Sequence, residues 1–353
     1  MTSFRSGRFF HWSLIVAALV VGVSTTLVVD WQRARYRRTH RTLTGNSARP
    51  FRIADSEFRF IDPLLGYELP SRGSVEPFRT IRAAMESVVN EATQAREAAD
   101  ISAYYRDLTT GSWFGIGEDR AYAPASLAKV PLMIAYLKLT ERHPELLQDR
   151  VTFRHAREAA PWQNVVPTER LVLGRTYTIA DLIRAMIVHS DNEAAYLLQA
   201  AADQPALAGV YEDLNIDPPD FQNPRDRITP EACARFFRFL YNGTYLTRGR
   251  SEQALELLSK STFDRGIVAG VPAEVTVSHK FGERIFTDVG VGVPTSELHD
   301  CGIVYHTDRP YLLCIMSRGW DLDALASVIA RVSAAVYTEV DRIPGTNETP
   351  PSS

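Results

Sequence analysis

The chain has 353 residues, of which 45% are hydrophobic and 23% are charged. This balance is ordinary for a globular protein, and the length fits one large domain or two intimate domains. A net charge of only −3 argues against a broad basic surface that binds nucleic acid. The cysteines (Cys233, Cys301 and Cys314) are far apart and form no CxxC pattern, so neither a cysteine-rich zinc site nor a disulfide scaffold is expected. Cys301 and Cys314 can pair across neighbouring strands, but we favour small buried hydrophobic side chains.

The N-terminal part carries an apolar stretch. Residues 14–29 are almost wholly apolar, and counted from Trp12 the stretch is just long enough to cross a bilayer as a helix. We therefore predict a membrane anchor over residues 12–30, followed by a linker to residue 50 that is rich in Arg, Thr and Ser. A cleavable signal peptide is the alternative, but no convincing small-x-small cleavage site follows the apolar run.

Residues 51–340 have the hydrophobic periodicity of a folded region. Apolar residues recur three or four apart over 75–99, which predicts a helix. Two strands joined by a hairpin turn follow at 101–107 and 112–118. The pattern from 126 to about 258 is mostly helical. Four strand-like segments follow at 274–280, 285–291, 301–306 and 311–316. A last helix is predicted over 322–340, and residues 341–353 are predicted to form a disordered tail.

This order of elements predicts the fold class. Strands occur near both ends of the folded region, and a long helical block lies between them. We therefore expect one interrupted α/β domain, in which an antiparallel sheet flanked by helices is built from both ends of the chain. An all-helical domain is inserted in the middle.

The segment Ser126-Leu-Ala-Lys129 carries the first chemical signal. It opens an apolar helix, and residues three apart on a helix share a face, so the Ser126 hydroxyl and the Lys129 amine can meet. The helix N-terminus favours negative charge that develops near Ser126. Apolar neighbours desolvate Lys129 and lower its pKa, so that a neutral amine can take the serine proton. A helix-capping serine beside a solvated lysine is the alternative.

Two further segments strengthen this interpretation. Ser190-Asp191-Asn192 follows a predicted helix over 179–188, which opens with the capping-box-like pair Thr178 and Asp181. The Ser190 hydroxyl can relay a proton and Asn192 can hold a substrate amide. A polar turn between two helices would have the same sequence pattern. His279-Lys280-Phe281-Gly282 ends a predicted strand. Lys280 offers positive charge to a substrate carboxylate, and Gly282 lets the backbone come close.

The order SxxK, SDN and KxG resembles the signature set of class A β-lactamases and penicillin-binding proteins. From about residue 75 to 340 the chain is similar to these penicillin-recognising serine hydrolases, and the predicted fold is similar to theirs. The resemblance implies that Ser126 is the acylated nucleophile, Lys129 its candidate base and Ser190 a third catalytic group. Asn192 and Lys280 would line the cleft, and the backbone N–H groups of Ser126 and Glu283 would form the oxyanion hole. No metal or organic cofactor is implied.

The sequence departs from this family pattern in two places. Phe281 stands where Thr or Ser is usual, which removes a hydroxyl that would bind a substrate carboxylate unless Arg284 or another donor replaces it. The family's loop glutamate, which activates water for deacylation, has no clear counterpart. Glu212 is the ExxN match, but we interpret it as a surface residue of a helix. Asp220 and Asp226 are weaker substitutes.

These observations leave three hypotheses for function. The first is a β-lactamase-like serine hydrolase that cleaves cyclic amides and deacylates slowly. The second is a peptidoglycan carboxypeptidase or transpeptidase, and the third is a catalytically silent binding domain of the same fold. For either enzyme we expect a membrane-anchored, extracytoplasmic catalytic domain in a bacterial envelope. The arginines at 33–41 conflict with that orientation under the positive-inside rule.

Overall fold

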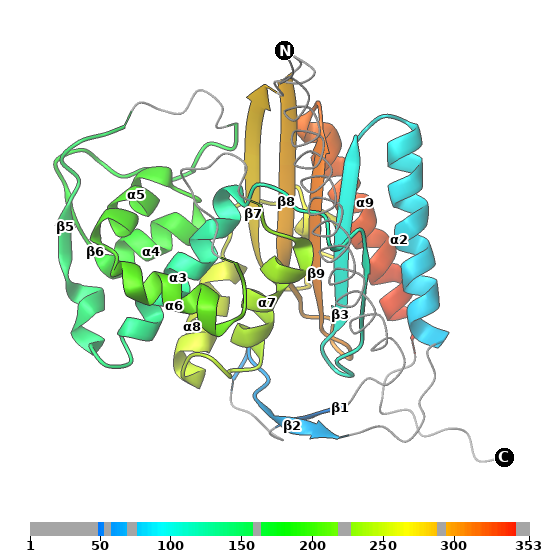
Figure 1. Cartoon of the computed structure of the whole chain (residues 1–353), viewed down its shortest axis with the longest axis horizontal. Helices are drawn as coiled ribbons and strands as arrows, with labels where there is room; N and C mark the ends of the chain where they lie inside the picture. Colours follow the sequence, from blue (N-terminus) through cyan, green and yellow to red (C-terminus); the bar gives the residue numbers. More distant parts are fainter. Residues whose placement is uncertain are drawn as a thin grey trace, which may run out of the picture. The chain divides into compact units, whose positions relative to one another are not determined.

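The main sheet is antiparallel and combines strands from both ends of the folded region (Figure 1). The computed structural model describes residues 49–52, 58–68, 76–157, 164–217, 227–287 and 294–343. The sheet has the order β4-β3-β9-β8-β7. Its strands are β3 (Asp100–Asp107), β4 (Trp113–Ile116), β7 (Val277–Thr287), β8 (Pro294–Val304) and β9 (Tyr311–Gly319). Because β3 pairs with β9 along its whole length, the prediction of an interrupted α/β domain is confirmed.

The two faces of the sheet bury different helices. The long helices α2 (Glu76–Gln94) and α9 (Leu322–Asp341) pack together on one face, as Figure 1 shows. Alternate side chains of a strand point to opposite faces. Accordingly, Tyr105 of β3 joins the core under α2 and α9, whereas its neighbour Tyr104 joins the core shared with the middle part of the chain.

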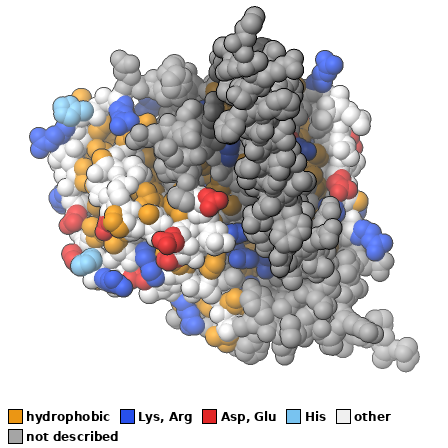
Figure 2. Space-filling model, in the orientation of Figure 1, with side chains coloured by type: hydrophobic (Ala, Val, Ile, Leu, Met, Phe, Trp, Pro, Cys, Tyr) orange, Lys and Arg blue, Asp and Glu red, His pale blue; other side chains and the backbone are white. Residues whose placement is uncertain are grey.

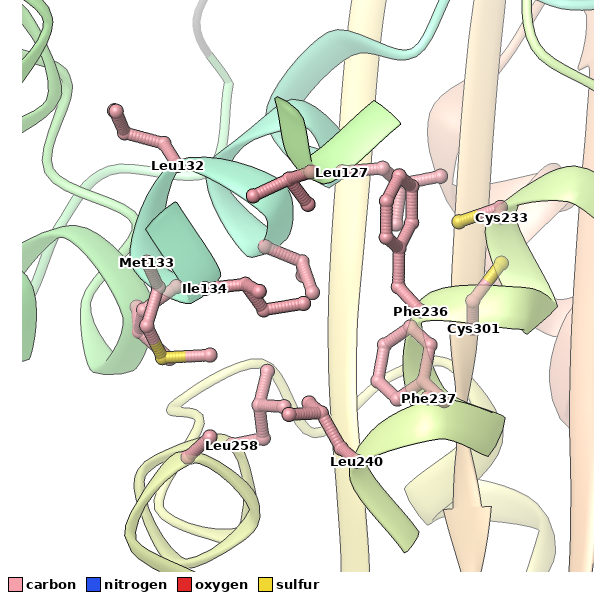
Figure 3. Close-up of a cluster of buried hydrophobic side chains, with 14 of the residues drawn as sticks. Leu127, Leu132, Met133, Ile134, Cys233, Phe236, Phe237, Leu240, Leu258 and Cys301 are labelled. Atoms are coloured by element: carbon pink, nitrogen blue, oxygen red, sulfur yellow. The ribbon is translucent and has the colours of Figure 1, made fainter. Parts of the chain in front are cut away.

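The middle part is the predicted inserted helical domain. Its helices are α3 (Lys129–Leu139), α4 (Ile179–Val188), α5 (Asn192–Ala201), α6 (Gln204–Asp213), α7 (Pro230–Tyr241) and α8 (Arg248–Ser259). Figure 3 shows side chains of α3, among them Met133 and Ile134, packed with Phe237 of α7 and Leu258 of α8. The domain is not all-helical, because a two-stranded ribbon of β5 (Arg150–Thr152) and β6 (Thr176–Thr178) interrupts it.

The 3-10 turns and the first strands complete the described elements. The turns are η1 (Ala125–Ala128), η2 (Pro144–Gln148) and η3 (Ile267–Gly270), and the strands β1 (Arg49–Arg52) and β2 (Leu64–Glu68) form a second ribbon. Sequence patterning missed both ribbons because strands of three to five residues give too few alternations to read.

The predicted strands at 274–280 and 285–291 are wrong in their boundaries. They are one continuous strand, β7, so Lys280 lies within a strand rather than at its end. Residues 277–282 are buried without alternation, because β7 is covered on both sides there. Strand β8 likewise begins at Pro294, well before the predicted 301, since its first half buries polar residues that hid it.

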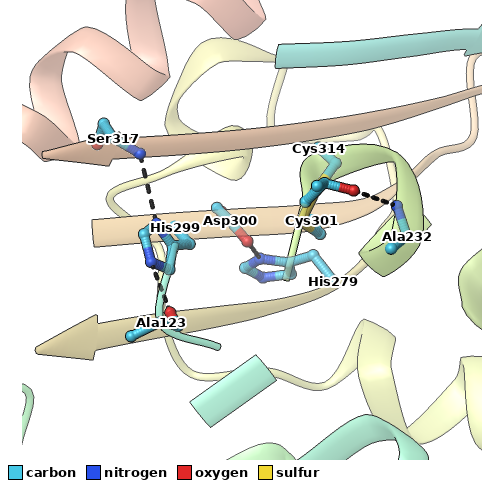
Figure 4. The surroundings of a disulfide bond; sticks show 9 residues. Ala123, Ala232, His279, His299, Asp300, Cys301, Cys314 and Ser317 are labelled. Carbon is cyan, nitrogen blue, oxygen red and sulfur yellow. Dashed lines mark hydrogen bonds and ion pairs between the residues drawn. A yellow bond between two sulfur atoms is a disulfide. The ribbon is translucent and has the colours of Figure 1, made fainter. Parts of the chain in front are cut away.

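Cys301 and Cys314 form a disulfide between β8 and β9 (Figure 4). They lie directly opposite each other in the antiparallel register. Our preference for unpaired buried thiols is therefore wrong for this pair. It holds for Cys233, a buried free thiol on α7.

Among the described helices, none combines the length and the apolar character needed to cross a bilayer. The predicted anchor over residues 12–30 lies outside the described residues, as do residues 31–48 of the linker and the tail from residue 344.

Candidate active site

Ser126 lies in the turn η1, immediately before helix α3 begins at Lys129. The helix thus starts three residues later than predicted. Ala128 and Lys129 nevertheless both have right-handed helical backbone, so the turn leads directly into the helix and the two residues remain three apart along it. Ser126 is partly exposed, whereas Lys129 is buried at the start of a helix that is apolar all round. The nucleophile candidate is therefore open to solvent while its partner amine is desolvated.

The backbone is strained at two points beside this position. Ala125 has a φ of 46° and Ser190 a φ of 54°, in the left-handed region that costs energy for residues other than glycine. Such conformations persist only where the surroundings enforce them, and they cluster at functional sites. Ala125 directly precedes the motif that begins at Ser126, and Ser190 is the first residue of its own motif.

Gly282 brings strand β7 against the turn that carries Ser126. A Cβ at this position would lie 3.2 Å from the Ser126 nitrogen and 3.0 Å from the Pro124 oxygen. Only a residue without a side chain allows the edge strand and the turn to approach this closely. The backbone of Gly282 therefore lies close to the Ser126 amide, while an oxyanion hole formed by the Ser126 and Glu283 amides stays a prediction.

Helix α4 delivers Ser190 to the same place. The predicted capping box is confirmed: the Thr178 hydroxyl accepts from the Asp181 amide, and the Asp181 side chain accepts from the Thr178 amide. Six of the helix's ten residues are buried, and it ends at His189. Asp191 then caps α5 by accepting from the Ala194 amide. Two short capped helices hold the buried Ser190 between them.

The two lysines meet at the Ser190 hydroxyl. Lys129 Nζ donates to Ser190 O at 2.7 Å, to Asn192 Oδ1 at 2.7 Å and to Ser190 Oγ at 3.1 Å. From the opposite side, Lys280 Nζ donates to Ser190 Oγ at 2.9 Å and to Phe281 O at 3.2 Å. The structure thus brings together Lys129, Ser190, Asn192 and Lys280, which come from three separate segments of the chain.

Burial lowers the pKa of both amines. The pKa of Lys129 falls to about 7, chiefly because burial penalises its charged form, although Asp191 and Glu283 oppose the shift. The pKa of Lys280 also lies well below the ordinary lysine value, first through burial and then through the charge of Lys129. Two buried amines this close cannot both hold a proton cheaply, so one of them is neutral near neutral pH.

A neutral Lys129 leaves its lone pair available. A neutral amine has two hydrogens, and the two carbonyl oxygens of Ser190 and Asn192, both at 2.7 Å, can take them. The lone pair is then left to accept a hydroxyl proton. Lys280 can meanwhile donate to the Ser190 oxygen, which orients the Ser190 hydrogen away from Lys280. The arrangement can carry a proton between hydroxyl groups and an amine.

Asn192 and Phe281 make contacts that the sequence did not predict. The Asn192 amide oxygen accepts a hydrogen bond from Lys129 Nζ. Phe281 has an aromatic ring in place of the usual hydroxyl side chain. It is buried and stacks on Phe263 with ring centroids 4.2 Å apart. Lys280 Nζ lies 4.1 Å from the centroid of the Phe281 ring, close enough for a cation–π contact when the amine is charged.

Buried histidines below the site were missed by sequence analysis. His279 bonds Asp300 at 2.8 Å, and His299 Nε2 lies 3.0 Å from the carbonyl oxygen of Ala123, as Figure 4 shows. Ala123 lies just before η1, so His299 ties β8 to the segment that carries Ser126. The polar residues Glu297, His299 and Asp300, interrupted only by Leu298, were the available signal, but such a stretch does not resemble a buried strand.

Of the candidate carboxylates for the family's loop glutamate, only Glu212 lies among the described residues. Glu212 is exposed at the end of α6, as interpreted from the sequence. Asp220 and Asp226 lie outside the described residues.

On the face seen in Figure 2, acidic, basic and apolar side chains are interspersed over the described part of the helical domain.

The model of the beta-lactamase enzyme family matches residues 81–340. The chain belongs to this family. The match covers the sheet from β3 onward, the helical domain and nearly all of α9. The resemblance found in the three motifs is therefore confirmed at the level of the family.

Curated relatives are distant. The chain is 28% identical over 268 residues to beta-lactamase FAR-1 of Nocardia farcinica, and the matched region covers 70% of this chain and 80% of that protein. It is also 28% identical over 192 residues to beta-lactamase L2 of Stenotrophomonas maltophilia, which covers 50% of this chain and 62% of that protein. At this identity, activity and substrate do not transfer without further argument.

Solved structures share the fold. A mutant of PBP-A, described as an acyl-enzyme complex with penicillin G, has a TM-score of 0.61 at 19% identity, covering 74% of this chain and 97% of that one. A variant of the reconstructed last common ancestor of the class A beta-lactamases of Gram-negative bacteria has a TM-score of 0.59 at 26% identity, covering 72% and 97%. The β-lactamase/transpeptidase-like fold is thus established.

Proposed function

We propose that the protein is a serine hydrolase that forms an acyl-enzyme on Ser126 and acts on the amide bond of β-lactams. The observation that carries the proposal is the meeting of Lys129 and Lys280 at the Ser190 hydroxyl, beside the turn that holds Ser126. Family membership supports the same chemistry. A silent binding domain has no physical need for two desolvated amines, whose burial costs free energy.

The geometry supports the following steps. Neutral Lys129 takes the proton of Ser126 Oγ as that oxygen attacks the amide carbonyl carbon. The backbone N–H groups of Ser126 and Glu283 stabilise the negative oxygen that develops. The carbon–nitrogen bond then breaks, and the proton passes from Lys129 through the Ser190 hydroxyl to the departing nitrogen. Lys280 orients Ser190 and offers positive charge to a substrate carboxylate.

Deacylation is proposed to be slow. Glu212, the sequence candidate for activating water, is exposed at the end of a helix, and its side chain makes no described contact with the site. Without a positioned general base, hydrolysis of the ester loses roughly 10²–10⁴-fold in rate. A long-lived acyl-enzyme follows from this.

A peptidoglycan carboxypeptidase or transpeptidase is the second candidate. The exposed position of Glu212 favours the transpeptidase in particular, because that enzyme passes its acyl group to an amine and does not depend on a base that activates water. Turnover of a peptidoglycan peptide faster than turnover of penicillin would select this candidate.

The test is intact-mass measurement after incubation with benzylpenicillin. We expect a covalent adduct equal to the mass of the whole penicillin, stable for minutes or longer, and its absence in Ser126→Ala. Rapid turnover without a persistent adduct would contradict slow deacylation. Neither adduct nor turnover would contradict the acyl-enzyme itself.

We also propose that the domain works outside the cytoplasm of a bacterial cell, held to its membrane by residues 12–30. The Cys301–Cys314 disulfide supports an oxidising compartment, because cytoplasmic thiols are generally kept reduced. Alkaline phosphatase fused after residue 343 should be active if this orientation is right, and inactive if the domain faces the cytoplasm.

A further inference from the structure

The Glu283 side chain joins the edge strand β7 to a segment of the helical domain. Its Oε1 accepts from the Asn164 amide at 3.0 Å and from the Val165 amide at 2.7 Å. A few residues on, the Thr168 hydroxyl lies 2.8 Å from His189 Nδ1, directly before Ser190. The segment 164–168 therefore runs between Glu283 and the Ser190 loop, along the site.

The other oxygen of this carboxylate lacks a donor in the part of the chain that the structure describes. Glu283 Oε2 is buried and has no hydrogen-bond partner among the described residues. Burial raises the pKa of this carboxyl, against the lowering effects of the Val165 and Asn164 backbone amides, the charge of Arg265 and the Asn164 side chain. An unmatched buried acceptor is costly, and a ligand, a water or an ion can supply the missing donor.

Glu283 also acts electrostatically on the reacting groups. Its charge raises the pKa of both Lys129 and Lys280, opposing the effect of burial. The residue follows Gly282, whose Cα approaches the Ser126 amide. If the Ser126 and Glu283 amides hold the reacting carbonyl oxygen, the substrate group next to that carbonyl lies beside the Glu283 side chain.

We propose that Glu283 is a specificity-determining residue, which selects acyl donors whose substituent on the carbon next to the reacting carbonyl carries a cationic group. Such a group supplies the donor that Oε2 lacks and is attracted by the carboxylate charge. A donor with a second carboxylate at that place is repelled. The inference rests on the proposed acylation of Ser126 and adds the class of substrate to it.

The test compares two penicillins that differ only at the α-carbon of the acyl side chain, one carrying an ammonium group and the other a carboxylate. The second-order rate constant of acylation is measured for each, in the wild type and in Glu283→Gln. The variant keeps an oxygen that can accept from Asn164 and Val165 but has no charge. We expect the wild type to prefer the ammonium compound, and the ratio of the two rates to fall roughly tenfold in the variant.

The matched control is Glu145→Gln, which removes the same charge from a side chain that is 71% exposed on η2. It should leave the ratio unchanged. If Glu283→Gln does not fold, the wild type alone tests the proposal. The ratio of the two acylation rates should then fall as added salt screens the charge of the Glu283 carboxylate.

The outcomes separate the two claims. A ratio that does not change in Glu283→Gln, or in the wild type with salt, overturns the role of Glu283 while the acyl-enzyme stands. If neither penicillin acylates the wild type, the proposed function fails and the inference fails with it.

Discussion

Ser190 is the residue at which the two buried lysines meet, and its hydroxyl is therefore the part of the site most open to a single-residue test. Ser190→Ala removes the oxygen that both amines contact. We expect the acylation rate to fall roughly a hundredfold, within the range of a lost proton-transfer group. Stopped-flow measurement of acylation by a chromogenic cephalosporin checks this.

A second variant separates the hydroxyl from the backbone. Ser190 has a φ of 54°, which glycine adopts without strain. Ser190→Gly should be as slow as Ser190→Ala if the hydroxyl carries the proton. Recovery of the wild-type rate in Ser190→Gly would show instead that only the backbone conformation matters.

At the scale of elements, the close approach of β7 and η1 sets the geometry of the site. Gly282→Ala places a methyl group 3.2 Å from the Ser126 nitrogen, tight enough to push the strand away from the turn. We expect acylation to slow by more than about tenfold, because displaced oxyanion donors lose much of their effect.

Gly209→Ala is the control for this substitution. Gly209 lies within α6, and an added Cβ there has no heavy atom within 4 Å. The acylation rate should not change, and the free energy of unfolding should rise by about 0.5–1 kcal/mol, the usual gain in a helix. Equal acylation rates in Gly282→Ala and the wild type would contradict the proposed position of the oxyanion hole.

The elements also show where sequence patterning succeeds. The helix over 179–188 was predicted to the residue, because its capping pair and its apolar period agree. Strand β8 was found only in its second half. Its first half buries Glu297 and His299, and buried polar residues carry no hydrophobic alternation.

At the scale of the whole molecule, the fold and the motif residues followed from the order of elements and from three short motifs. The contacts that these residues make with one another and with other segments could not be predicted in the same way. That Lys129 would bind Asn192, and that the Glu283 side chain would reach Asn164 and Val165, depends on how segments more than 60 residues apart pack together. Local periodicity holds no information about such contacts.

The buried lysine has a consequence for the stability of the whole domain. The pKa of Lys129 is about 7 in the folded state, against 10.5 for an ordinary lysine. Between these values the unfolded chain binds more protons than the folded one, so the free energy of unfolding rises with pH. We expect that rise to be smaller in Lys129→Met, in urea titrations across this pH range.

Part of the rise in the free energy of unfolding with pH should remain in Lys129→Met, because the pKa of Lys280 is also lowered. Identical pH dependence in Lys129→Met and the wild type would contradict a lowered pKa of Lys129.

The most direct test of a neutral lysine as the base for Ser126 is the rate of acylation as a function of pH. Since only the amine form accepts a proton, the rate should rise with pH and level off, with a midpoint near the Lys129 pKa of about 7. Lys129→Met should lose this rise together with most of the rate. A flat profile in the wild type, or wild-type acylation in Lys129→Met, would contradict the account.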